Sequence, residues 1–95
     1  MKLLGKQRID RFKRKHSTSR KRLNNWMQVV EEADWERLID IQQTYRDTEY
    51  VPGKDRYVFN VGGNEFRVIA KITFPARLVL VTDVLTHQEY DRLVG

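Results

Sequence analysis

The sequence predicts an α+β domain in which N-terminal helices pack on a mostly antiparallel β-sheet of about three or four strands, followed by a short C-terminal helix. The N-terminal half carries apolar residues at helical spacing, residues 57–81 alternate or run apolar as strands do, and residues 86–89 fit a helix start. At 95 residues the chain is expected to form one domain, residues 1–95, with a modest core.

The N-terminal segment is predicted to hold a short strand over Lys2–Leu4 and a helix from about Gln7 to Lys15, with Ile9 and Phe12 on its apolar side. Residues 17–19, Ser-Thr-Ser, interrupt this helix, and a hydroxyl there is expected to accept a free N–H of a second helix. Apolar residues at positions i, i+3, i+4 and i+7 predict that second helix, namely Leu23, Trp26, Met27 and Val30.

A short third helix is predicted next, with Asp34 as its cap and with Trp35, Leu38 and Ile39 repeating the helical spacing. Both tryptophans of the chain are expected to pack in the core rather than to stack on nucleic-acid bases. Residues 44–54 are interpreted as a turn-rich connection that ends at a Pro-Gly pair.

A β-hairpin is predicted around Gly62-Gly63, since residues without a Cβ accept the positive φ angles of a two-residue turn. Such a turn would pair Val61 with Asn64, Phe59 with Phe66, and Tyr57 with Val68. The apolar run Leu78–Val81 is expected to form a further strand that is covered on both faces, with helices packed on the sheet.

Alternation along the second hairpin strand assigns its side chains to two faces. The buried side is predicted to carry Phe66, Val68, Ala70, Ile72 and Phe74, so Glu65, Arg67, Ile69, Lys71 and Thr73 point the other way. Arg67 and Lys71 are therefore expected to share a surface, at a separation that suits successive phosphates. The alternative is that Arg67 pairs with Glu65.

Residues 86–89, Thr-His-Gln-Glu, fit the capping-box pattern and predict a short C-terminal helix. With Thr86 as the cap, His87 lies in the first turn, and Tyr90 and Asp91 follow at i+3 and i+4 on the same flank. This spacing predicts a compact polar group that includes one imidazole. The alternative is that His87 is an inert surface residue.

Charge is divided sharply along the chain. Residues 1–25 hold ten Lys or Arg against one acid, whereas residues 26–50 hold two against seven, and the whole chain carries a formal net charge of +5. We define the basic cluster as Arg11, Lys13, Arg14, Lys15, Arg20, Lys21 and Arg22. Such a one-signed cluster favours phosphate binding without sequence readout, and the alternative is a solvated helical face.

The chain has no cysteine, which excludes disulfides, thiolate zinc sites and a cysteine nucleophile. No convincing metal site is predicted, because His16 and His87 are far apart in sequence. The basic start is not followed by an apolar run long enough for a signal peptide or a membrane span. A soluble intracellular protein without a membrane partner is expected.

The C-terminal third also resembles a known family. Residues 58–74, VFNVGGNEFRVIAKITF, and residues 86–91, THQEYD, resemble the HigB family of bacterial type II toxins, relatives of the RelE and ParE toxins. The resemblance implies a RelE-like domain and a cytoplasmic, ribosome-dependent mRNA endonuclease without a cofactor. It also implies as partners the mRNA, the ribosome and a HigA-like helix-turn-helix antitoxin, with operator DNA reached only through the antitoxin complex.

The implied chemistry is metal-independent RNA cleavage, in which the ribose 2′-hydroxyl attacks the adjacent phosphorus. The expected catalytic residues are His87 for proton transfer, Tyr90 for stacking or hydrogen bonding, Asp91 for orienting the imidazole, Arg67 for phosphate charge, and Lys71 for further positive potential. The expected RNA-binding residues are Asn60, Asn64, Arg11, Arg14, Lys15, Lys21 and Arg22, although both asparagines also suit a purely structural role in the hairpin.

One departure from the family pattern is visible in the final strand. Thr82 stands where many members carry an arginine, and Asp83 beside it weakens the local positive field. Catalysis would then depend more heavily on Arg67 and Lys71.

Two other functions fit the sequence. A ParE-like toxin of the same broad fold would inhibit a topoisomerase without cutting RNA. A non-catalytic nucleic-acid-binding module would need only the basic cluster.

Overall fold

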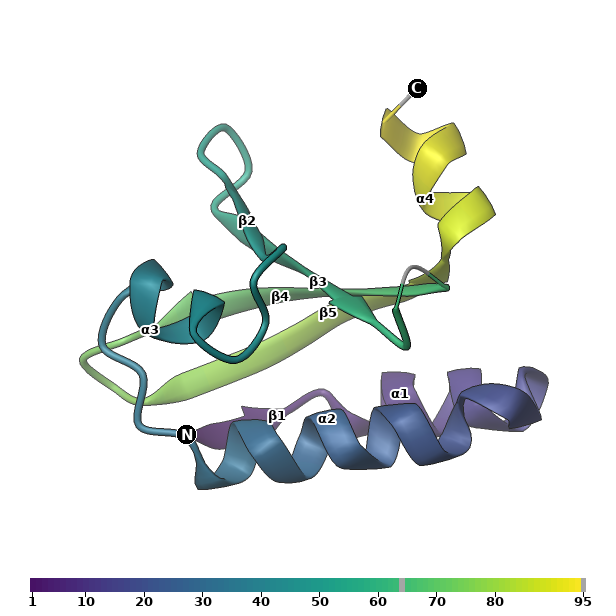
Figure 1. Cartoon of the computed structure of the whole chain (residues 1–95), viewed down its shortest axis with the longest axis horizontal. Coiled ribbons are helices and arrows are strands. Elements are labelled where there is room, and N and C mark those ends of the chain that lie inside the picture. The colour runs from purple at the N-terminus through teal and green to yellow at the C-terminus, as the bar shows by residue number, and fades with distance from the viewer. Residues whose placement is uncertain (64, 95) are drawn as a thin grey trace.

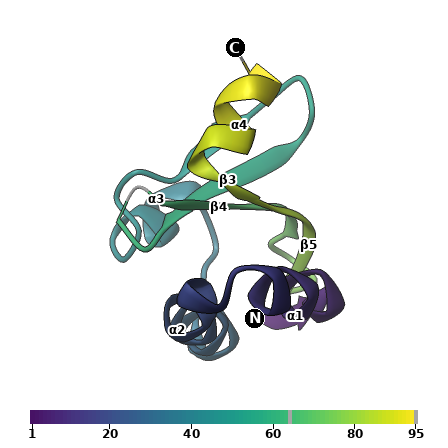
Figure 2. The ribbon, with the colours of Figure 1, turned by 90° about the vertical axis from the view of Figure 1, so that its right-hand side faces the viewer.

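The computed structural model describes residues 1–63 and 65–94 and has a sheet with helices on both sides (Figures 1 and 2). The α+β prediction is confirmed. In chain order the elements are β1 (Lys2–Leu4), α1 (Lys6–Lys15), the 3-10 helix η1 (Ser17–Ser19), α2 (Arg20–Glu32), α3 (Leu38–Gln42), β2 (Glu49–Val51), β3 (Arg56–Val61), β4 (Phe66–Thr73), β5 (Leu78–Thr86) and α4 (His87–Val94).

The sheet has the order β1-β5-β4-β3-β2 and five strands in the described part of the chain, rather than three or four. β1 runs parallel to β5, and the other neighbours are antiparallel. The strand that raises the number is β2, which lies within the segment 44–54 that was interpreted as a connection. Its three residues carry no periodicity of their own, and pairing with β3 is what makes them a strand.

The core lies between the sheet and the pair α1 and α2, which run side by side beneath it (Figure 2). Phe59 of β3 lies with its ring centroid 5.2 Å from that of Trp26 and 6.0 Å from that of Trp35. Phe66 of β4 meets Phe12 of α1 edge to face at 5.7 Å. Trp26 is fully buried and Trp35 is 5% exposed, so the prediction that both tryptophans serve packing is confirmed.

Two predicted helix caps are wrong. Ser19 precedes α2, but its hydroxyl donates to the carbonyl of His16 at 2.6 Å and does not accept from the helix. Asp34 forms an ion pair with Arg77 instead of capping α3. Asp40 takes that role, since its carboxylate accepts two backbone N–H groups just before the helix, at 2.9 and 3.1 Å.

The later start of α3 changes which of its apolar residues are buried. The helix begins at Leu38, and Ile39, which was expected on the apolar side, is 53% exposed. Ile41 is fully buried in its place. The Trp35 side chain packs in the core from the segment before the helix.

The hairpin register differs from the predicted one by two residues. The structure pairs Val61 with Phe66, Phe59 with Val68, and Tyr57 with Ala70, so four residues of the chain, 62–65, separate the paired strands. The Glu65 carbonyl, outside that ladder, accepts the backbone N–H of His87 at 2.8 Å. A shift by an even number keeps every side chain on its predicted face, and the predicted partner Asn64 lies outside the described residues.

β5 contains a β-bulge at Thr82. Val81 lies opposite Ala70 and Asp83 lies opposite Ile69, so Thr82 is the extra residue on its strand. The Thr82 hydroxyl donates to the carbonyl of Ile69 at 3.2 Å and closes the irregular part of the ladder. The bulge reverses the alternation, which brings Asp83 to the sheet face that lies away from α1.

The prediction that Leu78–Val81 is covered on both faces is wrong. Val79 and Val81 are fully buried on the inner face, but Leu80 on the outer face is 40% exposed. The reason is the placement of the helices. α1 and α2 cover the inner face, and α4 stands over the opposite end of the outer face (Figure 1). Within the described ranges, the chain has no helix long and apolar enough to cross a bilayer.

Candidate active site

The capping box at the start of α4 is confirmed. The backbone N–H of Thr86 donates to the Glu89 carboxylate at 2.9 Å, and the N–H of Glu89 donates to the Thr86 hydroxyl at 3.1 Å. The Thr86 backbone hydrogen bond is the main reason that the pKa of Glu89 lies below its ordinary value, and the positive fields of His16 and Lys15 act in the same direction. These contacts fix the direction in which α4 leaves the sheet.

Four predicted catalytic residues meet where α4 rests on β4. A guanidinium nitrogen of Arg67 lies 2.9 Å from Nδ1 of His87, and Nε2 of His87 lies 3.1 Å from the Asp91 carboxylate. The Arg67 guanidinium lies 5.6 Å from the ring centroid of Tyr90, within cation–π range. The Arg67 side chain also donates to the carbonyl of Phe66 at 3.2 Å.

These contacts define the hydrogen-bonding state of the imidazole. Arginine has donors only, so Nδ1 of His87 must be the acceptor in its contact with Arg67. Nε2 then carries the ring hydrogen and donates it to Asp91. Arg67 is 6% exposed, whereas the His87 and Asp91 side chains are 43% and 56% exposed. We refer to the contacts that link Arg67, His87 and Asp91 as the relay. Its His87 and Asp91 side chains are therefore open to solvent.

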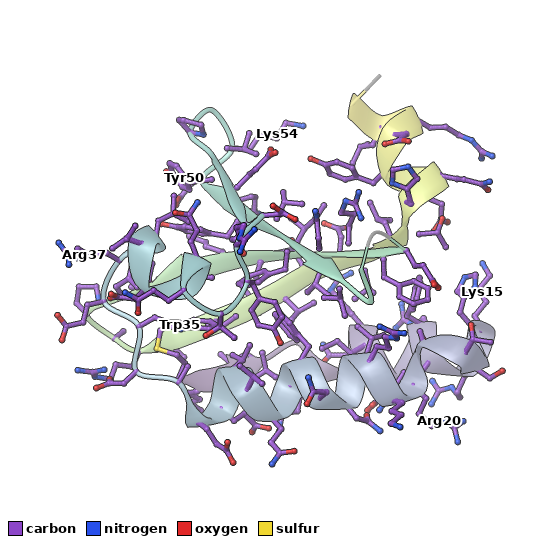
Figure 3. The ribbon with its side chains drawn as sticks, viewed as in Figure 1. Lys15, Arg20, Trp35, Arg37, Tyr50 and Lys54 are labelled. Carbon is purple, nitrogen blue, oxygen red and sulfur yellow. The ribbon has the colours of Figure 1, made fainter. Side chains whose placement is uncertain are left out.

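A groove opens beside this relay on the outer face of the sheet, between α4 and the hairpin formed by β2 and β3. Figures 1 and 3 show the two walls, with Lys54 labelled on the hairpin side. We refer to it as the β2–α4 groove; its volume is about 430 Å³ and it is lined by Val51, Lys54, Arg56, Val58, Ile69, Asp83, Tyr90 and Leu93. The volume lies within the usual range of small-ligand sites, roughly 300–1,000 Å³.

The hairpin wall of this groove is braced by its own hydrogen bonds. One guanidinium nitrogen of Arg56 donates to the carbonyls of Lys54 and Asp55, at 3.1 and 3.0 Å. The Tyr50 hydroxyl donates to the Asp55 carboxylate at 3.1 Å, and this bond is the first cause of a raised pKa at Tyr50. Arg56 is thereby held at the mouth of the groove by a turn that fixes its position.

The lining of the β2–α4 groove suits a nucleotide. Apolar side chains form much of its lining, Tyr90 offers an aromatic ring, and two cations stand on the hairpin wall. Single-stranded RNA is bound by this combination of aromatic stacking for bases and positive charge for phosphates.

The remaining predicted residues lie outside this groove. Lys71 is exposed on the same strand as Arg67 and is not part of the groove lining. Asn60 is half-buried and pairs with Arg67 across the strands, and Asn64 lies outside the described residues. The basic cluster lies on α1 and α2, on the far side of the sheet (Figure 3, Lys15 and Arg20).

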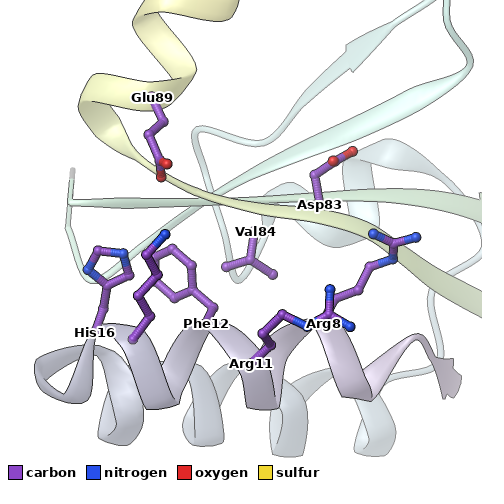
Figure 4. A pocket seen from close by; sticks show the side chains of 8 residues that line it. Arg8, Arg11, Phe12, His16, Asp83, Val84 and Glu89 are labelled. Atoms are coloured by element: carbon purple, nitrogen blue, oxygen red, sulfur yellow. The ribbon is translucent and has the colours of Figure 1, made fainter.

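Part of the basic cluster lines a second cavity, the α1–β5 pocket, of about 200 Å³ (Figure 4). Its α1 wall carries Arg8, Arg11, Lys15 and His16, and the opposite wall includes Glu89 from α4. Phe12 also lines the pocket, and its ring is tilted by 32° against the His16 ring at a centroid distance of 4.4 Å. Three cations line one side, and the carboxylates of Asp83 and Glu89 are part of the remaining lining, so the pocket is of mixed charge.

Sequence reasoning missed three charged residues of the β2–α4 groove, namely Lys54, Arg56 and Asp83. Lys54 was missed because it lies in the segment 44–54 that was interpreted as a connection, and Arg56 was missed although it begins β3. Alternation along β3 was the available signal, since it puts Arg56 on the face opposite to Tyr57. Asp83 was noted only for its charge, because the bulge that turns it outward leaves no pattern in the sequence.

Among the described residues, no group of three or more His, Cys, Asp or Glu side chains is arranged to hold a metal ion.

Comparison with known proteins places the chain in a family. Residues 19–93 match the HigB toxin family, the RelE-like toxic component of a toxin–antitoxin system. The chain belongs to the HigB family. The family resemblance found in the sequence is thus confirmed, and the arrangement of helices, mixed sheet and C-terminal helix fits the RelE-like fold.

Individual HigB relatives match to different extents. The chain is 54% identical over 35 residues to the mRNA interferase toxin HigB of Escherichia coli K12, a match that spans 37% of this chain and 34% of that protein. A protein of Shigella flexneri named mRNA interferase HigB matches to the same extent. The mRNA interferase HigB of Escherichia coli O6:H1 is 28% identical over 94 residues, 98% of this chain and 91% of that protein.

Proposed function

We propose that this HigB-family chain is the toxin of a type II toxin–antitoxin system and cleaves mRNA on the translating ribosome, in the cytoplasm. The observation that carries the proposal is the relay of Arg67, His87 and Asp91 beside a groove whose lining suits a nucleotide. The names of the relatives, mRNA interferase, support the same activity.

The proposed reaction needs no protein nucleophile. The ribose 2′-hydroxyl attacks the adjacent phosphorus, the bond to the 5′-oxygen breaks, and a 2′,3′-cyclic phosphate and a 5′-hydroxyl are left. The protein then has to move one proton from the attacking oxygen and one to the leaving oxygen, and to stabilise charge on the phosphate. Side chains suffice for these tasks, so we propose a metal-independent endoribonuclease.

The relay supplies the proton-transfer group in this proposal. Asp91 holds the outer nitrogen of the His87 ring and is itself 56% exposed, so an oxygen of the RNA can exchange with its carboxylate. The Asp91 carboxylate would then accept the proton of the 2′-hydroxyl. The His87 ring, protonated by solvent at Nδ1 as its contact with Arg67 opens, would give its Nε2 proton to the leaving 5′-oxygen and end neutral. Arg67 is too deeply buried for open contact with a phosphate, so we propose that it orients His87 and adds positive potential from below.

The groove would bind the message. Tyr90 would stack on a base, while Lys54 and Arg56 would contact the backbone phosphates that flank it. Lys71 would add positive potential from the exposed part of β4. Asn60 and Asn64 would position the phosphate or shape the β3–β4 turn.

The basic cluster would serve binding rather than chemistry. It lies on the helical side of the sheet, away from the β2–α4 groove. Phosphate contacts of this kind fix position without reading sequence. We therefore propose that Arg11, Arg14, Lys15, Lys21 and Arg22 grip ribosomal RNA while the opposite face meets the message.

Membership of a toxin–antitoxin family also implies an antitoxin partner. We propose a HigA-like helix-turn-helix protein for this role, with operator DNA bound only through the complex of toxin and antitoxin. Copurification of the chain with the product of an adjacent helix-turn-helix gene would test this partner.

The activity is tested by primer extension on an mRNA incubated with the purified chain, with and without translating ribosomes. The expected result is cleavage within codons only when ribosomes are present, and its loss in Tyr90→Ala and Arg56→Gln. A matched control is Arg37→Gln, which removes the same charge from an exposed position that is not part of the groove lining.

Other outcomes of this assay would point to the alternatives. Messages that stay intact while the chain still arrests growth and blocks gyrase would indicate a ParE-like inhibitor. RNA binding that survives in every groove variant, without any cleavage, would indicate a non-catalytic module.

A further inference from the structure

The β2–α4 groove contains one carboxylate, Asp83, among the residues that line it. Asp83 is exposed, lies opposite Ile69 in the sheet, and also lines the α1–β5 pocket, but it forms no ion pair with a described cation. Figure 4 shows its side chain on the side of β5 that faces away from α1. A negative group in a groove that binds RNA needs a physical explanation, because it repels phosphates.

The bulge at Thr82 is what puts this carboxylate in the groove. Val79 and Val81 face the core, so regular alternation would also turn Asp83 inward. The extra residue reverses the alternation, and the Thr82 hydroxyl closes the distorted ladder on the Ile69 carbonyl. Bulges commonly re-aim a side chain next to a functional site.

The partner of such a carboxylate must donate hydrogen bonds and carry no negative charge. In an RNA strand the donors are ribose hydroxyls and the amino and imino groups of the bases. An ionised carboxylate has two acceptor oxygens and no donor. Guanine is the base whose Watson–Crick edge places two donors side by side, the N1 imino and the N2 amino groups. Adenine and cytosine each place one donor beside an acceptor.

We propose that Asp83 is a specificity-determining residue that binds the Watson–Crick edge of a guanine in the message. The inference rests on the proposed function. The base would lie against Ile69 and the Tyr90 ring, its two donors would meet the Asp83 oxygens, and Lys54 and Arg56 would hold the adjoining phosphates. A good bidentate contact discriminates against a wrong base by roughly five- to 150-fold.

Two assays separate this inference from the proposed activity. The first measures binding of short RNAs that differ at one position, each with 2′-O-methyl groups that block cleavage. The wild-type chain is expected to bind the guanine RNA more tightly than the adenine RNA, by a factor within the range above. Replacement of guanine by inosine, which lacks the N2 amino group, is expected to remove a large part of that preference.

The second assay measures cleavage of ribosome-bound messages that carry each of the four bases at the cleaved codon. Asp83→Asn is the decisive variant, because an amide offers one acceptor and one donor. This variant is expected to lose the preference for guanine and to cleave messages with adenine or cytosine faster than the wild-type chain does. Asp47→Asn is the control, since it removes the same charge from an exposed position that is not part of the groove lining and should keep the wild-type preference.

The outcomes are distinct. Guanine-selective binding without any cleavage would refute the proposed activity and support the base site. Cleavage without a guanine preference, or with a preference that Asp83→Asn leaves unchanged, would refute the role of Asp83 while the activity stands. A chain that shows neither selective binding nor cleavage would overturn both.

Discussion

Replacement of Arg67 by alanine is expected to loosen α4 from the sheet and to lower the free energy of unfolding. The change removes a charge-assisted hydrogen bond to His87, a bond to the Phe66 carbonyl and the contact with the Tyr90 ring. A hydrogen bond to a charged group contributes about 1.5–3 kcal/mol and an aromatic contact of a cation about 0.5–2 kcal/mol.

The two hydrogen bonds and the ring contact sum to about 3.5–8 kcal/mol, and exposure of the partners brings the expected loss below that sum. The His87 side chain is 43% exposed, so solvent replaces part of what is lost there. We therefore expect Arg67→Ala to lower the free energy of unfolding by about 2–4 kcal/mol. A small domain with a total of about 5–15 kcal/mol remains folded but clearly weakened.

Urea denaturation measures this loss, and hydrogen exchange of the α4 amides reports where it occurs. Lys71→Ala on the same strand is the control, since an exposed substitution usually changes stability by less than about 0.5 kcal/mol. A double-mutant cycle with His87→Ala is expected to give a coupling of about 0.5–1.5 kcal/mol. Equal unfolding midpoints for the Arg67 and Lys71 variants, with unchanged exchange in α4, would refute the proposed positioning role.

Three further predictions concern other parts of the molecule. Gly5→Ala is expected to lower the free energy of unfolding by at least about 2 kcal/mol. The reason is that φ at Gly5 is +82° and a Cβ there would lie 2.4 Å from the Val81 carbonyl oxygen. Gly53→Ala, with open space around it, should be nearly neutral in the same thermal denaturation experiment. Glu89 has a lowered pKa in the folded chain, so its contribution to stability is present above the ordinary pKa of 4.5 and is lost as pH falls below it. Glu89→Gln should flatten that part of the curve of stability against pH. An unchanged curve would count against the capping box as the cause of the lowered pKa. A version of the basic cluster with glutamine at each position is expected to bind ribosomes more weakly and with a smaller salt dependence, and equal slopes in a salt titration would exclude a phosphate-binding role.

The outer and inner faces of the hairpin were predictable because alternation does not depend on the turn. The register was wrong by two residues, and yet Phe66 and Val68 remain inside and Arg67 outside. The C-terminal helix was predictable because a capping box is a local motif whose partners lie three residues apart. Local chemistry of this kind survives whatever tertiary structure surrounds it.

The parts that sequence reasoning missed depend on contacts between distant segments. β2 is a strand because β3 is beside it, and the β3–β4 pairing begins only at Val61 and Phe66. The bulge at Thr82 is set by the ladder with β4. The charged residues Lys54, Arg56 and Asp83 are brought to the β2–α4 groove by these strands and this bulge. The groove itself could therefore not be predicted.

Burial of the predicted cation was also beyond the sequence. Alternation put Arg67 on the outer face, which at first implies solvent. α4 then covers that end of the sheet, and its His87 and Tyr90 enclose the guanidinium. The sequence predicted which residues form the site. The role of each depends on its depth, with Arg67 buried and His87 and Asp91 open to solvent.

In the proposed function, the outer face of the sheet cuts RNA and the helical face only binds it. The most direct test is the single-turnover rate of message cleavage on programmed ribosomes, at saturating protein, for Arg56→Gln beside the glutamine version of the basic cluster. We predict that the Arg56 variant binds ribosomes normally and cleaves much more slowly, while the cluster variant cleaves at the wild-type rate once bound. A normal rate for Arg56→Gln, with a rate defect in the saturated cluster variant, would contradict this division between the two faces.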